Sequence, residues 1–566
     1  MNLLCALALA SIALTPSLVP RPTVFQGFLA GLWFMIGFQL GFLLRWAAQA
    51  ACEGIRALAQ RRGLIRPRSE AKTGRARRRP QSAAGPIVLG IALVAYVVGY
   101  GALVVSWQNE VRRLVEMEPV DGAGHAAFLL SMFTTMILFY GIAGGIGALR
   151  SAIARSVERG GGSAVLARSA GQASSVAAVL ILVVGFLGAG LAAVNTLYED
   201  RDADTPAGIS RPFLSERSGG PGSTLTWEGL GRHGRAFSSG GPSGAQIANV
   251  TGTPALEPIR VYAGLSQAPD AASRAAAVVD ELERTGAFER EVLLVATPTG
   301  SGWLEPQAIA SFEYLYGGDT ATASMQYSTQ PSWVSFLFRP GLAVDSSEAL
   351  FDAVHDRWRA IPEEDRPRLA VYGLSLGAQG MAGSFEGLDD LLTRTDAALF
   401  TGPPANSQPW RGLQAARDAE SPVWQPVYQA GEQVRWQSKP GDFAELPGPW
   451  RQPRIGYLQH ATDPITWLEP AVLFQRPAWL AGPAAAGGRG ADVSDAMQWI
   501  PGVTFLHLVT DMLMSEAVPP SHGHNFGDVA VDGWAQVLPG HDRDGAQLAA
   551  IQSIIEQIDS QDPAWE

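Results

Sequence analysis

The chain has 566 residues, more than one ordinary compact domain holds, and a formal net charge of −11. The basic residues of its first part gather in two loops, and the remainder is acidic without a long Lys/Arg run, which excludes the usual basic surface of a nucleic-acid-binding protein. Both cysteines, Cys5 and Cys52, lie in the first part, so we expect no disulfide framework. No Cys/His cluster has the spacing of a zinc site, and we expect neither a metal nor another cofactor.

Apolar runs long enough to cross a membrane, about 20 residues each, dominate the first part. Four such runs lie at roughly 23–45, 86–107, 127–147 and 174–196. A fifth run, at roughly 2–19, is shorter and ends at Pro20. We interpret it as a retained helix, and the alternative is a cleaved signal peptide, because residues 6–10 are rich in Ala. Glycine spacing that permits close helix packing occurs at Gly141, Gly144, Gly145 and Gly147.

The charges of the connecting loops predict how these helices are oriented. The loops at 51–85 and 148–173 carry ten and four Lys or Arg residues against two and one acidic residues, whereas the loop at 108–126 carries two against four. An excess of Lys and Arg marks the cytoplasmic side. We therefore expect a multi-pass protein of the cell membrane in which everything after about residue 197 is extracytoplasmic. Almost no ionisable residue lies at the centre of a run, which argues against a transporter.

Strand-like and helix-like runs alternate in the second part, after a Gly-, Ser- and Arg-rich linker and lead-in at 197–255. This alternation predicts an α/β fold with a mostly parallel sheet, here of the α/β-hydrolase type, over 256–566. The expected strands lie at 259–264, 291–296, 368–372, 396–401, 454–459 and 503–509. The expected helices lie at 269–286, 305–315, 346–360, 377–384 and 545–558. A segment with four tryptophans suits either a lid or acyl-binding surface or core packing, at Trp410, Trp424, Trp436 and Trp450.

A Gly-x-Ser-x-Gly motif at residues 373–377 makes Ser375 the candidate nucleophile. This motif places a serine on a sharp turn between a strand and a helix, where side chains larger than glycine would clash. The motif alone is weak evidence in a chain with 63 glycines. Its context is stronger, because an apolar strand at 368–372 precedes it and a helix-compatible run follows it.

Candidates for the two partners of the serine follow in the chain order of an α/β-hydrolase, which is Ser, then Asp or Glu, then His. Asp463 lies after an expected strand and before a proline, so it belongs to a loop at the strand's end. Asp511 is the rival carboxylate. We favour His524 as the base because Phe526 can pack behind its ring, and His522 is the alternative base.

The oxyanion hole of such a site uses the backbone N–H after the nucleophile, here that of Leu376, and a second N–H from the loop after an earlier strand. By the order of elements along the chain, that loop contains Leu265. The glycine-rich loop at 299–302 is the alternative.

With these residues identified, the chain resembles a bacterial, largely actinobacterial family of membrane-anchored α/β-hydrolases that joins a multi-span N-terminal domain to a C-terminal hydrolase domain. The matching stretches are 258–264, 281–288, 297–303, 318–321, 326–328, 372–377 and 523–526. The resemblance implies the fold and Ser375 as nucleophile, and it supplies no substrate. One departure is Ser521 before His522, where Gly-His is expected.

The leading functional hypothesis is a serine hydrolase, esterase- or lipase-like, that acts on an ester of a lipid or a cell-envelope component. The membrane is then a partner, and nothing in the sequence fixes the oligomeric state. Two alternatives remain open on the same residues: an envelope acyltransferase that uses the same serine, and a non-catalytic binding or scaffold protein, because fold does not imply activity.

Overall fold

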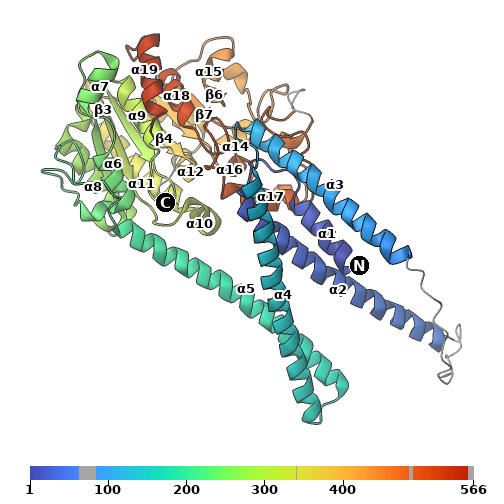
Figure 1. Ribbon diagram of the computed structural model, residues 1–566. Helices are drawn as coiled ribbons and strands as arrows, with labels where there is room; N and C mark the ends of the chain where they lie inside the picture. The colour runs from blue at the N-terminus through green and yellow to red at the C-terminus, as the bar shows by residue number, and fades with distance from the viewer. Residues whose placement is uncertain (63–83, 340, 483–487, 559–566) are drawn as a thin grey trace. The chain divides into compact units, whose positions relative to one another are not determined.

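The computed structural model describes residues 1–62, 84–339, 341–482 and 488–558 (Figure 1). Most of the basic loop expected at 51–85 therefore lies outside the described residues. The contacts divide the chain into two compact units. The first comprises Met1–Pro16, Pro20–Arg113 and Glu118–Phe186; the second comprises Ser17–Val19, Leu114–Met117 and Leu187–Glu566. Two short turns of the N-terminal region thus belong to the second unit.

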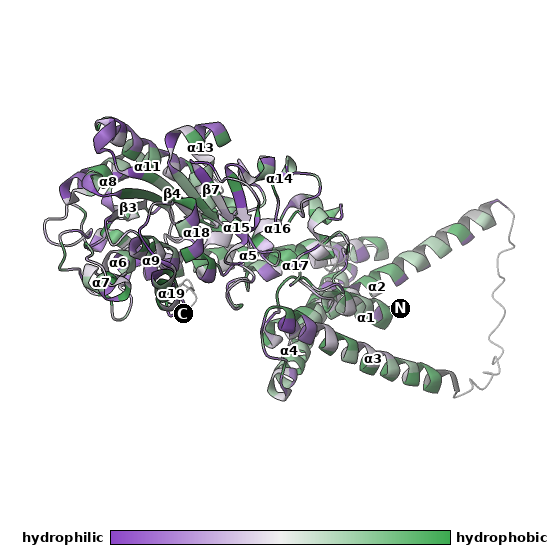
Figure 2. Cartoon of the chain, turned by 90° about the horizontal axis from the view of Figure 1, so that it is seen from above, coloured by the Kyte–Doolittle hydropathy of each residue, from purple (hydrophilic) through white to green (hydrophobic). Residues whose placement is uncertain are grey.

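Long apolar helices make up the first unit. Their bounds are α1 (Asn2–Ala13), α2 (Thr23–Arg61), α3 (Ala84–Leu114), α4 (Gly122–Arg159) and α5 (Ala164–Ala203), the last of which ends in the second unit. Four of them, α2 to α5, are long and apolar enough to cross a membrane, and they contain the four runs expected from the sequence. Figure 2 shows the predominance of hydrophobic residues along α2 and α3.

Close packing in the first unit depends on glycines of α2. A Cβ atom on Gly37 would lie 2.4 Å from the carbonyl oxygen of Cys5 in α1, and one on Gly27 would lie 2.3 Å from that of Phe128 in α4. Such distances exclude a side chain. At Gly141, Gly144, Gly145 and Gly147, whose spacing permits close packing, nothing lies within 4 Å of a Cβ built there. Glycine spacing permits an approach but does not say which face meets a neighbour.

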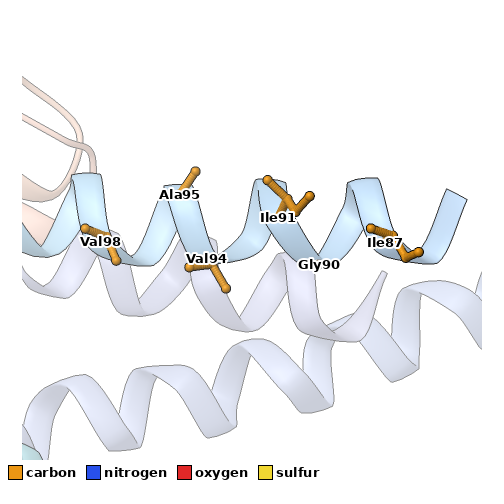
Figure 3. Close-up of a pocket in the computed structure, with 6 residues that line it drawn as sticks. All are labelled: Ile87, Gly90, Ile91, Val94, Ala95 and Val98. Atoms are coloured by element: carbon orange, nitrogen blue, oxygen red, sulfur yellow. The ribbon is translucent and has the colours of Figure 1, made fainter. Parts of the chain in front are cut away.

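A shallow hollow on α3 has only apolar walls (Figure 3). Its lining residues are Ile87, Gly90, Ile91, Val94, Ala95 and Val98. Ile87, Ile91 and Val94 are each about 60% exposed, at 59%, 64% and 62%. None of these lining residues has a polar side chain that could orient a ligand, and an exposed apolar surface of this kind is compatible with a helix in contact with lipid.

A parallel seven-stranded sheet forms the centre of the second unit. Its strands are β1 (Ile259–Ala263), β2 (Val292–Thr297), β3 (Thr320–Met325), β4 (Arg368–Leu374), β5 (Ala397–Thr401), β6 (Val434–Gln437) and β7 (Arg454–Leu458). They lie in the order β1-β3-β2-β4-β5-β7-β6, and every pair is parallel. After β3 the chain crosses to the other side of β2 to form β4. Such a switch point is where open α/β sheets place their sites, at the carboxyl ends of the strands.

Helices cover both faces of this sheet (Figure 1). Besides α5, the helices of the second unit are α6 (Gly231–Ser239), α7 (Gly244–Thr251), α8 (Ala271–Thr285), α9 (Pro306–Leu315), α10 (Ser332–Phe338), α11 (Gly341–Arg359), α12 (Leu376–Gly383), α13 (Leu388–Arg394), α14 (Trp410–Ala415), α15 (Asp442–Glu445), α16 (Pro464–Trp467), α17 (Val503–Met512), α18 (Ala530–Val537) and α19 (Gly545–Ile555). Leu293 and Val295 pack with α8, α11 and α12 on one face, and Leu294 and Ala296 pack with α9, α18 and α19 on the other. This alternation is the two-residue period of a strand buried on both sides.

Two features of the second unit differ from expectation. The strand expected at 503–509 is wrong, because this segment is the helix α17. Its buried residues Thr504, His507, Leu508 and Asp511 recur at helical spacing, and a short apolar run does not distinguish the two structures. Two strands were not predicted from the sequence: β3, whose residues are mostly Thr, Ala and Ser, and the four-residue β6.

Three of the four tryptophans of the tryptophan-rich segment are buried in the hydrophobic core of the second unit. Trp410, Trp436 and Trp450 are 4%, 2% and 7% exposed. The indole N–H of Trp410 donates to the side chain of Gln459, and that of Trp450 donates to the backbone of Gln433. These three residues therefore pack in the core and do not form a lid or an acyl-binding surface.

Candidate active site

Ser375 lies on the tight turn between β4 and α12. Its φ and ψ are 57° and −123°, a backbone conformation that costs a non-glycine residue about 1–3 kcal/mol and that clusters at functional sites. A Cβ on Gly373 would lie 2.3 Å from the carbonyl oxygen of Gly377, and one on Gly377 would lie 2.2 Å from that of Thr297. Both glycines of the motif are therefore required by close backbone approach, and the strand–turn–helix context expected from the sequence is present.

Asp463 is the N-cap residue of the short helix α16, in the loop that follows β7, and it is completely buried. One carboxylate oxygen, Oδ1, accepts the backbone N–H of Ile465 at 2.9 Å. The other, Oδ2, accepts the hydroxyl of Thr466 at 3.2 Å and lies 2.7 Å from Nδ1 of His524. The carboxylate is thus fixed by its own helix and holds the imidazole of His524 in one orientation.

His524 lies over the end of β5, the strand beside β4. A Cβ on Gly402 would lie 2.4 Å from Cε1 of His524, and the preceding Thr401 accepts the backbone N–H of Ser375 at 2.9 Å. Ser375 and the imidazole of His524 therefore contact the same two-residue segment, Thr401 and Gly402. Phe526 packs edge-on to the ring of His524 at 5.5 Å. With Nδ1 held by Asp463, Nε2 of His524 is buried and has no hydrogen-bond partner.

Two opposing effects set the pKa of His524. Burial lowers it, because a charged imidazolium is poorly solvated there, but the charge of Asp463, its hydrogen bond and the charges of Glu516 and Glu305 together raise it by more. The net pKa lies above the ordinary value of histidine. The imidazole is therefore a stronger base than a free histidine and is stabilised when it takes up a proton.

His522 has a carboxylate of its own. Its Nδ1 lies 3.1 Å from Oδ2 of Asp492, which also accepts the hydroxyl of Thr462 at 3.0 Å. That hydroxyl in turn accepts the backbone N–H of Gly523 at 2.9 Å. The pair formed by His522 and Asp492 therefore braces the loop that carries His524, and it does not share Asp463. Asp492 was not predicted from the sequence, because it lies in a turn outside the helices and strands.

His460 supports the same loop from the end of β7. Its Nδ1 is 3.0 Å from the carbonyl oxygen of Gly523, and its ring stacks on Phe526 at 4.2 Å. Burial lowers the pKa of His460, so the ring is neutral at pH 7 and Nδ1 is the donor.

Glu305 is a buried carboxyl group that sequence analysis missed. It is 3% exposed, and the hydroxyl of Tyr372 in β4 donates to its Oε2 at 2.7 Å. Burial raises the pKa of Glu305 to about 7, although the bond from Tyr372 and the charge of His524 act to lower it. The only sequence signal was its place before Pro306 at the start of a helix. Glu305 is close enough to His524 for the two charges to interact, so its ionisation bears on the base.

Asp511, the rival carboxylate, is also buried, but its Oδ2 accepts the backbone N–H of Leu18 at 3.0 Å. Asp463 is the carboxylate that holds His524. Asp511 lies on α17, and its contact is with the turn that contains Leu18.

Leu265 does not lie at the site, so its proposed place in the oxyanion hole is wrong. It follows β1, which β3 and β2 separate from β4, and its N–H faces Oε1 of Gln326 at 3.3 Å. The error came from counting strands along the chain without β3. The alternative loop follows β2, the neighbour of β4, and the carbonyl oxygens of Thr297 and Pro298 lie against Gly377. In that loop the hydroxyl of Thr299 is buried and has no hydrogen-bond partner.

The N-terminus of α12 provides the first donor expected for an oxyanion. The N–H of Leu376 opens this helix and has no partner within it, and the positive end of the helix dipole favours negative charge there. Among the residues that the structure describes, no three His, Cys, Asp or Glu side chains gather as a metal site would require.

Comparisons with known proteins agree with this fold. A family model described as an alpha/beta-hydrolase family matches residues 259–551, and a model described as the N-terminus of that family matches residues 14–242. The chain belongs to this α/β-hydrolase family. The resemblance inferred from sequence, with an N-terminal domain of apolar helices joined to a hydrolase domain, is confirmed. No curated protein and no solved structure gives a significant match. Membership of the α/β-hydrolase family does not by itself fix the reaction or the residues that perform it.

Proposed function

We propose that the chain is a membrane-anchored serine hydrolase that cleaves a carboxylic ester of a lipid or cell-envelope component on the extracytoplasmic side. The observation that carries the proposal is the buried pair of Asp463 and His524, 2.7 Å apart, beside a serine in a strained turn. A serine hydroxyl needs such a base to become a nucleophile at neutral pH. The unpartnered Nε2 of His524 is the atom available to take its proton.

The reaction proceeds in two halves. Oγ of Ser375 attacks the ester carbonyl carbon while its proton passes to Nε2 of His524, which gives a tetrahedral oxyanion. When the oxyanion collapses, His524 returns the proton to the departing alcohol, and an acyl-enzyme remains on Ser375. Water then attacks the acyl group by the same route, and the acid and free Ser375 are released.

The proposed oxyanion donors are the N–H of Leu376 and the hydroxyl of Thr299. The two belong to loops after adjacent strands, β4 and β2, that touch through Gly377. A buried hydroxyl without a partner is costly, and a developing negative charge would satisfy it. The backbone N–H of Thr299 is not available, because it donates to Trp303 at 2.9 Å.

A Thr299→Val variant, which replaces the hydroxyl by a methyl group of similar size, tests this second donor. Removal of one oxyanion donor typically lowers kcat by about 10²–10³ with little change in KM. Thr299→Ser keeps a hydroxyl and should retain activity within about tenfold of the parent. Steady-state kinetics on an activated ester measures both. Equal activity of the valine variant and the parent would remove Thr299 from the mechanism.

The pH profile of kcat/KM tests the base. His524 acts only when neutral, so its raised pKa places the acid limb above the ordinary histidine value of about 6.5. Loss of the Asp463 charge in Asp463→Asn lowers that pKa, and the limb should move to lower pH. Glu305→Gln is the control, since Glu305 itself titrates near neutrality, at about 7. In Glu305→Gln the acid limb of the profile should shift slightly to lower pH but persist. If the limb disappeared in Glu305→Gln alone, it would report the titration of Glu305.

Two observations support the extracytoplasmic location. The loop charges place the loop at 108–126 and everything after about residue 197 on the same side of the membrane. Independently, the turns Ser17–Val19 and Leu114–Met117 group with the hydrolase unit. Segments of one folded unit cannot lie on opposite sides of a membrane, so this grouping agrees with the orientation predicted from charge.

A panel of esters of increasing acyl length, dispersed and in vesicles, tests the substrate class on the full-length protein. Hydrolysis that rises with acyl length and with vesicle presentation would support a lipid ester. A folded protein that cleaves none of them, with Ser375→Ala as the blank, would contradict the proposal.

A further inference from the structure

The turn after the first apolar helix is buried in the hydrolase unit. Ser17, Leu18 and Val19 are 4%, 1% and 0% exposed, and contacts group all three with the second unit. Leu18 belongs to the cluster of buried apolar side chains that covers one face of the sheet and includes Leu508 of α17. Residues nearly 500 positions apart thus share one core.

A directed bond accompanies this packing. The N–H of Leu18 donates to Oδ2 of Asp511 at 3.0 Å, a bond between residues 493 positions apart in the chain. Asp511 is completely buried near the end of α17. This N–H supplies a donor to the buried carboxylate, so a directed bond joins the turn at 17–19 to α17.

The helix α17 connects that bond to the site. On one side it packs against α16, the helix that Asp463 begins. On the other, the chain leaving α17 passes Ser515, whose carbonyl oxygen accepts the backbone N–H of His524 at 2.8 Å. Gly523 fits closely here, since a Cβ on it would lie 2.4 Å from the same oxygen. Helix α17 therefore contacts α16, which positions Asp463, and the chain that leaves α17 contacts the loop that carries His524.

We propose that residues 17–19 form a strap that holds α17, and through it the loop 513–526, in the geometry that lets Asp463 orient His524. Leu18 and Asp511 are positioning residues in this account, and neither touches substrate. The effect of the strap on catalysis rests on the proposed function, whereas its effect on the position of α17 does not. It also means that the hydrolase unit is completed by a piece of chain that lies before the first long membrane helix.

Hydrogen–deuterium exchange on the full-length protein tests the strap without requiring activity. Leu18→Ala and Asp511→Asn should increase exchange in peptides from 511–526 by about tenfold or more. Exchange in peptides from β2 and β4 should stay within about twofold, because those strands are held by the sheet. Leu18→Met, which conserves volume, and Phe213→Ala, at a residue 91% exposed, are the matched controls and should behave as the parent. The rate of labelling by a fluorophosphonate should fall about tenfold in the two strap variants as the base loses its orientation.

Unchanged exchange at 511–526 in both strap variants would overturn the proposal, and so would a uniform increase over the whole sheet, which indicates general destabilisation. Asp511→Asn keeps the size of the side chain and serves if Leu18→Ala does not fold. A parent protein that fails to react with the probe would contradict the proposed hydrolase and leave the exchange result valid.

Discussion

Replacing Ser375 by alanine is expected to lower kcat for ester hydrolysis by a factor on the order of 10⁶, with the fold and KM unchanged. The substitution removes only the hydroxyl group, which is the group proposed to form the acyl-enzyme. The turn itself should tolerate the change, since alanine bears the same Cβ at φ 57°. The thermal midpoint of the variant should therefore match that of the parent.

Ester hydrolysis by purified parent and variant, followed to the detection limit, measures this effect. Ser384 provides a matched control, because it lies at the other end of α12 and its hydroxyl donates to the carbonyl of Gly380 at 3.0 Å. Ser384→Ala should keep nearly full activity. A Ser375→Ala protein with activity close to that of the parent would require another nucleophile.

The two histidines of the same loop should behave very differently when each is replaced by alanine. His524→Ala removes the base and should lower kcat by at least about 10⁴, as expected for loss of a residue that acts as a unit with the nucleophile. His522→Ala removes only a brace of the loop, the contact with Asp492 at 3.1 Å. Its cost should stay within about tenfold in kcat.

Asp492→Asn extends this comparison, because it should resemble His522→Ala, whereas Asp463→Asn should resemble His524→Ala. Steady-state kinetics on the four variants decides between the two pairs. If His522→Ala and Asp492→Asn lost the activity and the other two retained it, His522 would be the base.

The parts of the site that could be predicted from sequence are those that a local rule determines. The motif around Ser375 requires a strand before it and a helix after it, and both are visible as apolar runs. Asp463 follows a recognisable strand and precedes a proline, and His524 comes last in the chain with Phe526 beside it. Chain order restricted these choices enough to select the residues that the structure brings together.

What the sequence did not reveal depends on contacts between distant segments. Strand β3 is buried by its neighbours although its residues are small and polar, so no hydrophobic pattern marks it, and its omission misplaced Leu265. Helix α17 has a run of apolar residues too short to be told from a strand. Neither the burial of Glu305 nor the bond between Leu18 and Asp511 has a local signature, because each is made by elements far apart in the chain.

Mass spectrometry of the full-length protein after reaction with a fluorophosphonate shows whether Ser375 is the nucleophile. We expect a single phosphonyl adduct on the peptide that contains Ser375, formed in the parent, absent from Ser375→Ala and strongly slowed in His524→Ala. An adduct that persists in Ser375→Ala, or a folded parent that forms none, would contradict this expectation.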